Sequence, residues 1–224
     1  MDRINRRQWL GMLAGGAAVG SLPVLTGGCA AGKPAAMSLK RSDFYDAEDK
    51  FKPEAAKDAY IEFMERKGYI ASKNLRDNMW VADFALGRFL EVGMGGMFWI
   101  NNKDDGFTAL EMMLFPGQMV PEHWHVQTPD AKAKMEVWHV RWGEIYTYGP
   151  GEATPNMKAN IPQGGGPHVT VKHERIVHIG EVHGISKPLE VHWMAAGPEG
   201  AILTEYSTYH DNNGVKFTNP KATL

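Results

Sequence analysis

Two histidines and a glutamate lie close together in the stretch PEHWHVQTPDAKAKMEVW, residues 121–138. Side chains two positions apart on a β-strand point to the same face, so we expect His123 and His125 to project together. Glu136 follows on the next predicted strand, on the face that it shares with Lys134. A carboxylate that faces an interior needs a partner, because burying an unpaired charge is costly. A divalent metal ion shared with the two imidazoles would supply that partner.

A fourth metal ligand should come from a later strand. His192 lies within the apolar run LEVHWMAA, where an isolated imidazole is poorly accommodated. By contrast, His139 alternates to the face opposite Glu136, and His173 and His183 fall at predicted turns. Three nitrogens and one oxygen suit manganese, iron, cobalt, nickel or zinc, and ligand type alone does not select among them. A strand that merely contains histidines is the alternative, and these residues leave it open.

The elements that would position these side chains are short. From about residue 80 onward, apolar runs alternate with Gly, Pro, Asn and Asp. Many short strands at close spacing predict an all-β sandwich or barrel. The candidate strands are residues 96–100, 108–115, 122–126, 134–142, 144–149, 168–172, 174–180, 189–196 and 201–209.

One amphipathic helix is predicted before the strands, in PEAAKDAYIEFMERKGY. Pro53 stands near its start and Gly68 near its end, as is typical of helix boundaries. Five residues share one face at helical spacing: Ala56, Ala59, Tyr60, Phe63 and Met64. We expect this helix to cover one flank of the domain.

Composition limits the function classes. The chain has 224 residues, 43% of them hydrophobic and 22% charged, with a formal net charge of −2. This length suits one domain with a core of its own. Neither a basic surplus nor a basic run is present, which argues against a nucleic-acid or anionic-membrane binder and favours a small-molecule partner.

The first 29 residues are interpreted as an export signal. Arg6 and Arg7 with Leu10 form an Arg-Arg-x-x-Leu pattern that resembles a twin-arginine signal, which implies the twin-arginine export machinery as a partner. The glycine-rich stretch 9–25 is too short and weakly apolar to make a convincing membrane-spanning helix, although an N-terminal anchor is the alternative.

Cys29 is the single cysteine, and it follows Gly27 and Gly28 where the apolar stretch ends. This pattern resembles a lipoprotein processing site, so lipidation of Cys29 and plain cleavage nearby are both open. We therefore expect an exported protein, periplasmic or membrane-anchored through Cys29. The predicted organisation is a signal peptide over 1–29, a linker over 30–48, and a domain over 49–224.

The order His-x-His, Glu and a distant His resembles the metal-binding pattern of the cupin superfamily. Four longer stretches are similar to the D-lyxose isomerase family of cupin sugar isomerases: LRDNMWVADFALGRFLEVGMGGMFWINN, LFPGQMVPEHWH, KMEVWHVRWGE and HWMAAGPEGAILTEYSTYHDNNGVKFTNP. The resemblance runs from about residue 50 to the C-terminus. It implies a single cupin barrel, a double-stranded β-helix or jelly roll, with an N-terminal helical segment, one divalent metal ion (usually manganese) and a homodimer.

Carried over by position, the resemblance makes His123, His125, Glu136 and His192 the metal ligands. Lys134 matches a lysine thought to act at the substrate, with Lys132 as a rival for that role. Glu205 matches the acidic residue proposed for proton transfer, and a structural salt bridge is the alternative for it. Four tryptophans could line a sugar pocket or only pack the core: Trp124, Trp138, Trp142 and Trp193.

The implied activity is a metal-dependent aldose–ketose isomerisation of a monosaccharide by enediol proton transfer. D-lyxose to D-xylulose is the expected reaction, with D-mannose to D-fructose as a second. Two other classes use similar residues: a metal-dependent cupin dioxygenase, and a non-catalytic exported sugar-binding cupin. Metal analysis with oxygen uptake separates the first from an isomerase, and absence of turnover identifies the second.

Overall fold

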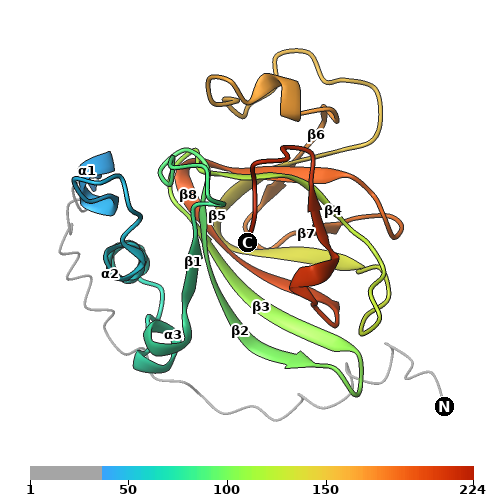
Figure 1. The fold of residues 1–224 in the computed structure, drawn as a ribbon, viewed down its shortest axis with the longest axis horizontal. Helices are drawn as coiled ribbons and strands as arrows, with labels where there is room; N and C mark the ends of the chain where they lie inside the picture. Colours follow the sequence, from blue (N-terminus) through green and yellow to red (C-terminus); the bar gives the residue numbers. More distant parts are fainter. Residues whose placement is uncertain (1–36) are drawn as a thin grey trace, which may run out of the picture. The chain divides into compact units, whose positions relative to one another are not determined.

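The computed structural model describes residues 37–224 (Figure 1). The predicted export signal, Cys29 and the first part of the predicted linker lie outside the described residues. The helical elements are α1 (Arg41–Phe44), α2 (Pro53–Arg66), α3 (Lys73–Asn78), and the 3₁₀ turns η2 (Gly166–His168) and η3 (Asn212–Gly214). Within the described part of the chain, no helix is long and apolar enough to cross a membrane.

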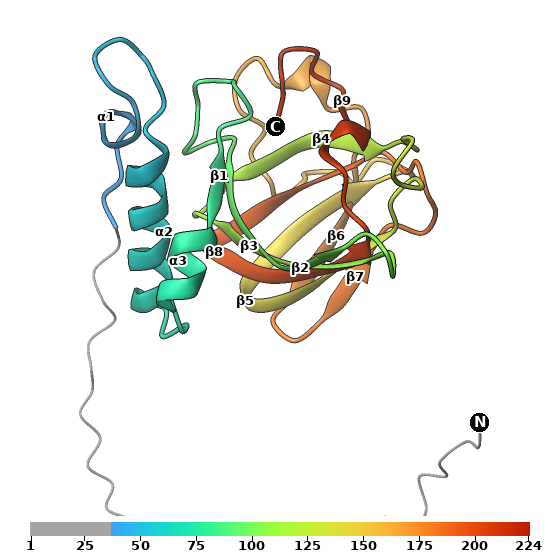
Figure 2. The same ribbon diagram turned by 60° about the horizontal axis from the view of Figure 1, so that its bottom comes forward.

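The predicted amphipathic helix is confirmed as α2. Pro53 opens it, and Gly68, at φ +69°, follows its end in the left-handed conformation that glycine adopts readily. Its buried residues are Ala56, Tyr60, Phe63 and Met64. This face packs against β1 and β2, so the helices cover one flank of the barrel (Figure 2).

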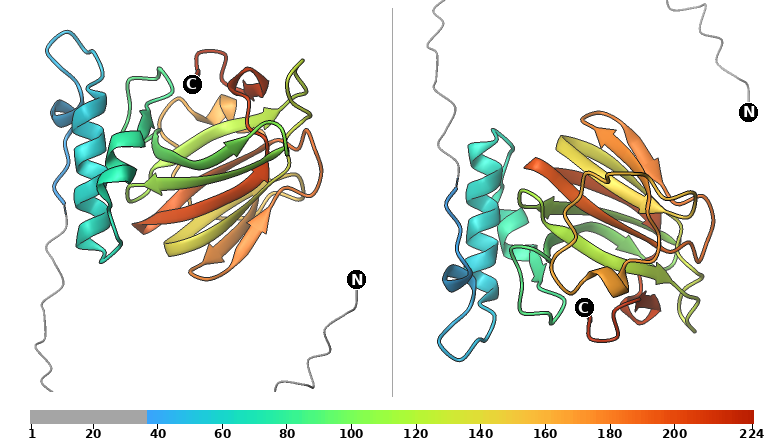
Figure 3. Two further views of the ribbon diagram at one scale, coloured as in Figure 1. Left: turned by 90° about the horizontal axis from the view of Figure 1, so that it is seen from below. Right: turned by 90° about the horizontal axis from the view of Figure 1, so that it is seen from above.

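Nine strands make up the described β-structure. They are β1 (Trp80–Ala82), β2 (Met94–Asn102), β3 (Phe107–Leu114), β4 (Met119–His125), β5 (Glu136–Gly149), β6 (His173–His178), β7 (Val182–Gly184), β8 (His192–Thr208) and β9 (Val215–Phe217). All named pairings are antiparallel, in the order β1-β2-β3-β8-β4-β9, with β5 paired to β6, β7 and β8. The sheet curls on itself into a barrel (Figure 3). The predicted fold class, mainly β with an N-terminal helical segment, is confirmed.

The two longest strands, β5 and β8, cross from one side of the barrel to the other. Each was predicted as two strands, because Gly143 and the Gly197–Gly200 stretch resemble turns. Both strands bend there instead of ending. A side chain at Gly143 would place its Cβ 2.1 Å from the carbonyl oxygen of Gly200, and Gly143 and Gly200 both have positive φ angles. Glycine therefore permits the close approach at which both strands turn.

Two other predictions were wrong in detail. Residues 168–172 form no strand; they continue from η2 as an irregular segment, whose backbone N–H groups at Thr170 and Val171 bond to the buried Glu122 carboxylate instead of to a strand. The predicted linker also extends too far, because α1 lies within it. Phe44 and Tyr45 are buried, and the Tyr45 hydroxyl donates to Asp83 at 2.9 Å, which anchors this segment to the folded unit.

The described residues form three apolar clusters, and two of them lie next to the parts of the fold that position the site. One lies inside the barrel and includes Leu110, Trp138, Val140 and Leu203. The other lies between the helices and the outer surface of the sheet, where Tyr60 stacks on Phe115 at 4.1 Å. The barrel interior is therefore largely apolar, and the charged groups that it encloses need local partners.

Candidate functional site

Three strands bring the four predicted metal ligands together. β4 carries His123 and His125, β5 begins at Glu136, and β8 begins at His192. The β4–β8 register places His123 directly opposite His192. All four residues are buried, and one potential ligand atom from each lies within 4.8 Å of the others. The group can therefore hold a metal ion.

Backbone carbonyls orient two of the imidazoles. His123 Nδ1 lies 2.8 Å from the carbonyl oxygen of Pro121, and His192 Nδ1 lies 2.8 Å from that of Glu190. A carbonyl only accepts hydrogen bonds, so each Nδ1 carries the proton and donates it. Each Nε2 is then left with a free lone pair, as a metal ligand requires.

The contacts around Glu136 test whether these residues fit a metal. His192 Nε2 lies 2.6 Å from Glu136 Oε1, and His125 Nε2 lies 3.2 Å from the same oxygen. The His192 nitrogen has no hydrogen-bond partner despite this approach. Lone-pair atoms that converge without a hydrogen bond are expected where a cation binds between them. Three nitrogens and a carboxylate oxygen fit a divalent first-row metal ion, whose identity the ligand set leaves open.

Electrostatics favour the ligand forms of three of these residues. Burial lowers the pKa of His123 well below its usual value and also lowers that of His125. Burial alone would raise the pKa of Glu136, but the charge of Lys134 helps to hold it well below its usual range. Burial acts to lower the pKa of His192, yet the Glu136 carboxylate outweighs it and the net direction is upward. Neutral His123 and His125 and ionised Glu136 suit metal binding at neutral pH.

A buried ion-pair network lies beside the ligands. Lys134 Nζ lies 2.7 Å from Glu136 Oε2 and 2.5 Å from Glu205 Oε1, and all three side chains are at most 5% exposed. Burial tends to lower the pKa of Lys134, but the two carboxylates outweigh it and raise it. Burial raises the pKa of Glu205, although Lys134 opposes that shift. Lys132 is exposed, so of the two lysines it is Lys134 that belongs to this buried network.

The network opens into a cavity within the barrel. The free volume of this cavity is about 50 Å³, enough for a few water molecules. Charged and imidazole groups at one side face a mainly apolar wall that includes Met94, Leu110 and Phe217. Such a cavity can surround a small polar molecule while limiting its contact with bulk water.

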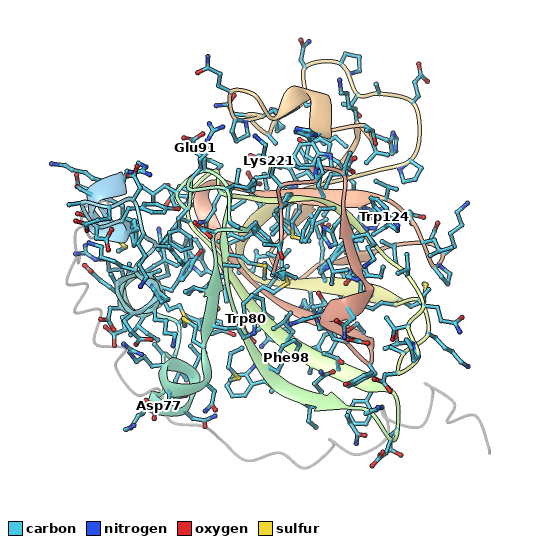
Figure 4. The ribbon with its side chains drawn as sticks, in the orientation of Figure 1. Asp77, Trp80, Glu91, Phe98, Trp124 and Lys221 are labelled. Carbon is cyan, nitrogen blue, oxygen red and sulfur yellow. The ribbon has the colours of Figure 1, made fainter. Side chains whose placement is uncertain are left out.

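Of the four tryptophans considered from the sequence, only Trp138 lines this cavity. Trp193 stacks on Tyr148 at 3.8 Å in a separate apolar cluster, and Trp142 packs edge-on against Phe63. Trp124 points away from the barrel interior (Figure 4). Core packing, and not sugar stacking, is therefore the role of Trp142 and Trp193.

Two polar residues of the cavity wall, Trp80 and His210, were not among the site residues predicted from the sequence. Trp80 lies on β1, which the prediction treated only as the start of the strand region. His210 lies just beyond the end of β8, five positions after Glu205. A polar aromatic residue near each end of the barrel sequence was the available signal, but spacing alone does not show that such residues meet in space.

No model of a protein family matches the chain. Among individual proteins, it is 34% identical over 165 residues to a D-lyxose ketol-isomerase of Thermofilum sp. (strain ex4484_79), covering 74% of this chain and 90% of that protein. It is 38% identical over 146 residues to a D-lyxose/D-mannose isomerase of Thermosediminibacter oceani, covering 65% and 79% of the two chains.

Solved structures with the same fold include L-ribose isomerases. That of Cellulomonas parahominis with L-psicose superposes with a TM-score of 0.59 at 13% identity, covering 81% of this chain and 98% of the other. That of Acinetobacter sp. DL28 with L-ribose gives a TM-score of 0.53 at 13% identity, covering 80% and 95%. At this identity the likeness concerns the fold, a curled antiparallel barrel with few helices.

Proposed function

Because the chain belongs to the D-lyxose ketol-isomerase family of sugar isomerases, we propose that it converts D-lyxose into D-xylulose and also acts on D-mannose. The observation that carries this proposal is the buried Lys134–Glu205 pair beside the His-and-Glu cluster. D-lyxose and D-mannose have the same configuration at C2, C3 and C4, so one site can accept both sugars.

We propose that His123, His125, Glu136 and His192 hold one divalent ion, with manganese as the preferred metal. A divalent ion bound there supplies Lewis-acid stabilisation of negative charge on the oxygens of C1 and C2. The paired Nδ1 bonds of His123 and His192 fix their rings, so their Nε2 atoms converge without further movement.

Glu205 is the group proposed to move the proton. Its carboxylate removes the proton from C2 of the open-chain aldose, and the electron pair of that C–H bond forms the C1–C2 double bond. The same carboxyl returns the proton to C1, while the proton of the C2 hydroxyl passes to the oxygen on C1. Atoms and electrons balance within the sugar, so no oxidant or reductant is required. A raised pKa suits a carboxyl that both takes and returns a proton.

Lys134 is proposed to position Glu205 and to donate a hydrogen bond to a sugar oxygen. Its ammonium group already lies between two carboxylates, so it keeps both charges stable inside an apolar barrel. A nitrogen with three donors can contact both carboxylates and still offer a third hydrogen bond to the substrate.

The test combines metal analysis with a substrate panel. Purified protein is analysed for bound metal, then loaded separately with manganese, cobalt and iron and incubated with D-lyxose, D-mannose and other aldoses. NMR detects the ketose, and an oxygen electrode records any oxygen uptake. The proposal expects ketose without oxygen uptake. Oxygen consumption would indicate the dioxygenase alternative, and ligand binding without turnover would indicate a sugar-binding cupin.

We also propose a homodimer formed through the outer face of the sheet. Ile100 and Tyr206, each 44% exposed, and Val137, 36% exposed, lie in one cross-strand row with Ala109 between the first two. Exposed apolar rows of this kind are typical of protein contacts, and a two-fold pairing of identical faces would cover them. Light scattering tests this directly: a mass near twice 24.9 kDa supports the dimer.

Export remains a proposal that rests on residues 1–29. We propose translocation by the twin-arginine machinery, followed by lipidation of Cys29 or cleavage near it. Mass spectrometry of the mature N-terminus from periplasmic and membrane fractions separates the two outcomes. An acylated N-terminal Cys29 that is lost in Cys29→Ala supports the anchor, and an unprocessed cytoplasmic chain contradicts export.

A further inference from the structure

Buried polar atoms almost always have hydrogen-bond partners, so exceptions call for an explanation. Within residues 37–224, Trp80 Nε1, Ser207 Oγ and His210 Nδ1 are buried side-chain atoms without a hydrogen bond. His192 Nε2 and Glu205 Oε1 also lack one by geometry, although each lies in a close charge contact, with Glu136 and Lys134 respectively. The proposed metal and proton chemistry accounts for His192 and Glu205. Trp80 and His210 line the same cavity as Glu205, and nothing described so far uses their polar atoms.

Trp80 and His210 both lie next to one aromatic residue, Phe98. The Trp80 ring is 6.0 Å from the ring of Phe98, and the His210 ring is 5.3 Å from it. Figure 4 shows Trp80 and Phe98 next to each other between β1 and β2. The arrangement joins an apolar ring to an N–H donor and a ring nitrogen, which together match the C–H and O–H groups of a sugar chain.

The hydrogen-bond role of His210 is fixed by its neighbour. Nε2 lies 2.7 Å from Oδ1 of Asn212, which accepts, so Nε2 carries the proton and Nδ1 is left as an acceptor. The backbone is also held, because His210 N donates to Asn101 Oδ1 and Asn101 Nδ2 donates to the His210 carbonyl, both at 3.0 Å. His210 is therefore a preorganised acceptor, in contrast to a mobile surface histidine.

We propose that Trp80 and His210 bind hydroxyl groups of the sugar at carbons beyond C1 and C2. The Trp80 indole N–H donates to one hydroxyl oxygen, and His210 Nδ1 accepts from a hydroxyl proton. This inference rests on the proposed function, and it adds two specificity residues to that site. A polyhydroxylated chain supplies both a donor and an acceptor at each hydroxyl, whereas an apolar ligand would leave both protein atoms unpaired.

Access to the two atoms requires a small adjustment. Both are shielded from water, so the hydroxyls must displace neighbouring side chains to reach them. Leu224 lines the same cavity and is 47% exposed, so its side chain has room to move. Side-chain rearrangements of this size are common when ligands bind.

These contacts should act on binding and not on the chemical step. The hydroxyls concerned do not react, so their hydrogen bonds are equally strong in the ground state and the transition state. Loss of such a bond raises KM and leaves kcat unchanged. We expect Trp80→Phe and His210→Phe each to raise KM about 3- to 10-fold, with kcat within about 2-fold of the parent value.

A matched control is Trp99→Phe, the same substitution at a partly exposed indole on β2. The Trp99 N–H already donates to Glu111 Oε2 at 3.0 Å, so it has no free polar atom to offer a sugar. This variant should keep the KM of the parent. Metal content and the thermal midpoint are measured for every variant, and the two test substitutions are made separately so that a folding failure in one leaves the other informative.

A measurement of ligand binding that does not depend on turnover completes the test. In protein labelled with ¹⁵N at its seven tryptophans, the Trp80 indole N–H resonance is identified by its loss in Trp80→Phe. We expect that resonance, and not the Trp99 resonance, to shift when an unreactive pentitol is added to the metal-loaded protein. An unmoved Trp80 resonance in a protein that isomerises aldoses would overturn this inference and leave the proposed function intact. A shifted Trp80 resonance in a protein without isomerase activity would support the contact with the polyol and overturn the proposed function.

Discussion

Lys134 Nζ and Glu205 Oε1 lie 2.5 Å apart inside the barrel, and each side chain is only 5% exposed. The same ammonium group also contacts Glu136, so one cation joins the proposed metal ligand to the proposed proton carrier. This relationship explains how two carboxylates are tolerated in an apolar interior. It also predicts that the metal site and the proton-transfer site depend on one another.

Replacing Lys134 should therefore disturb both sites. Lys134→Met leaves two buried carboxylates without their cation, and breaking a buried pair in this way typically costs about 3–5 kcal/mol of unfolding free energy. We expect that loss in urea unfolding, together with loss of isomerase activity. The matched control is Lys132→Met at an exposed position, where the change should stay within about 0.5 kcal/mol. Equal effects of the two variants would refute the assignment of Lys134.

Among the histidines, only the three proposed ligands, His123, His125 and His192, should be needed for metal binding. His123→Ala removes one of the four clustered ligands, and we expect bound metal to fall from near-stoichiometric to trace levels by elemental analysis. Chelation of the parent protein should also lower its thermal midpoint, because a ligand that binds only the folded state stabilises it. His139→Ala, on the opposite face of β5, is the control and should keep its metal. A chelator without effect on stability would argue against the site.

Glu122 should be required for the stability of the β4 region. Its buried carboxylate accepts from the backbone N–H groups of Thr170 and Val171 and from the hydroxyls of Thr170 and Thr218, at 2.6 to 2.9 Å. Glu122→Gln replaces one accepting oxygen with a donor that faces other donors. We expect a loss of roughly 2–3 kcal/mol in unfolding free energy, with weakened metal binding at the adjacent His123. Unchanged stability would mean that this network is not needed.

Acid should destabilise the metal-free protein through His210. Burial lowers the pKa of this imidazole to about 4 from an ordinary value of 6.5. Between these two values the unfolded chain binds the proton and the native protein does not, so the free energy of unfolding falls as the pH falls. Relative to neutral pH, this residue lowers the free energy of unfolding by roughly 3 kcal/mol, and the full decrease is reached at about pH 4. Between pH 7 and pH 4, the free energy of unfolding should depend less strongly on pH in His210→Phe than in the parent protein. Parallel curves would contradict the assignment.

Much of the site was predictable because strand alternation is local. The spacing of His123 and His125 fixes a shared face. Lys134 lies two residues before β5 begins and so is not on the strand predicted for it, but its side chain lines the same cavity as Glu136 and Trp138. The proposal of His192 as a partner drew on its place within an apolar run, and the cross-strand register now places it opposite His123.

The remainder depended on contacts that spacing does not encode. Gly143 and Gly200 were interpreted as turn residues, because nothing local shows that their backbones meet. Phe44 falls within the predicted linker, because the sequence does not show that its side chain is buried against the helices. Trp80 and His210 are 130 positions apart, and only barrel closure brings both to the cavity wall. The sequence patterns do not show which distant parts of the chain meet when the barrel closes.

Proton transfer by Glu205 beside a metal site is best tested with metal-loaded protein and D-lyxose in D₂O. We expect NMR to detect D-xylulose with the parent protein, and we expect Glu205→Gln to slow its formation roughly 100-fold or more while retaining its bound metal. Glu65→Gln on the exposed face of α2 serves as the matched control and should retain full activity. Ketose formation by Glu205→Gln at the parent rate would contradict the account, as would absence of ketose from every aldose with the parent protein.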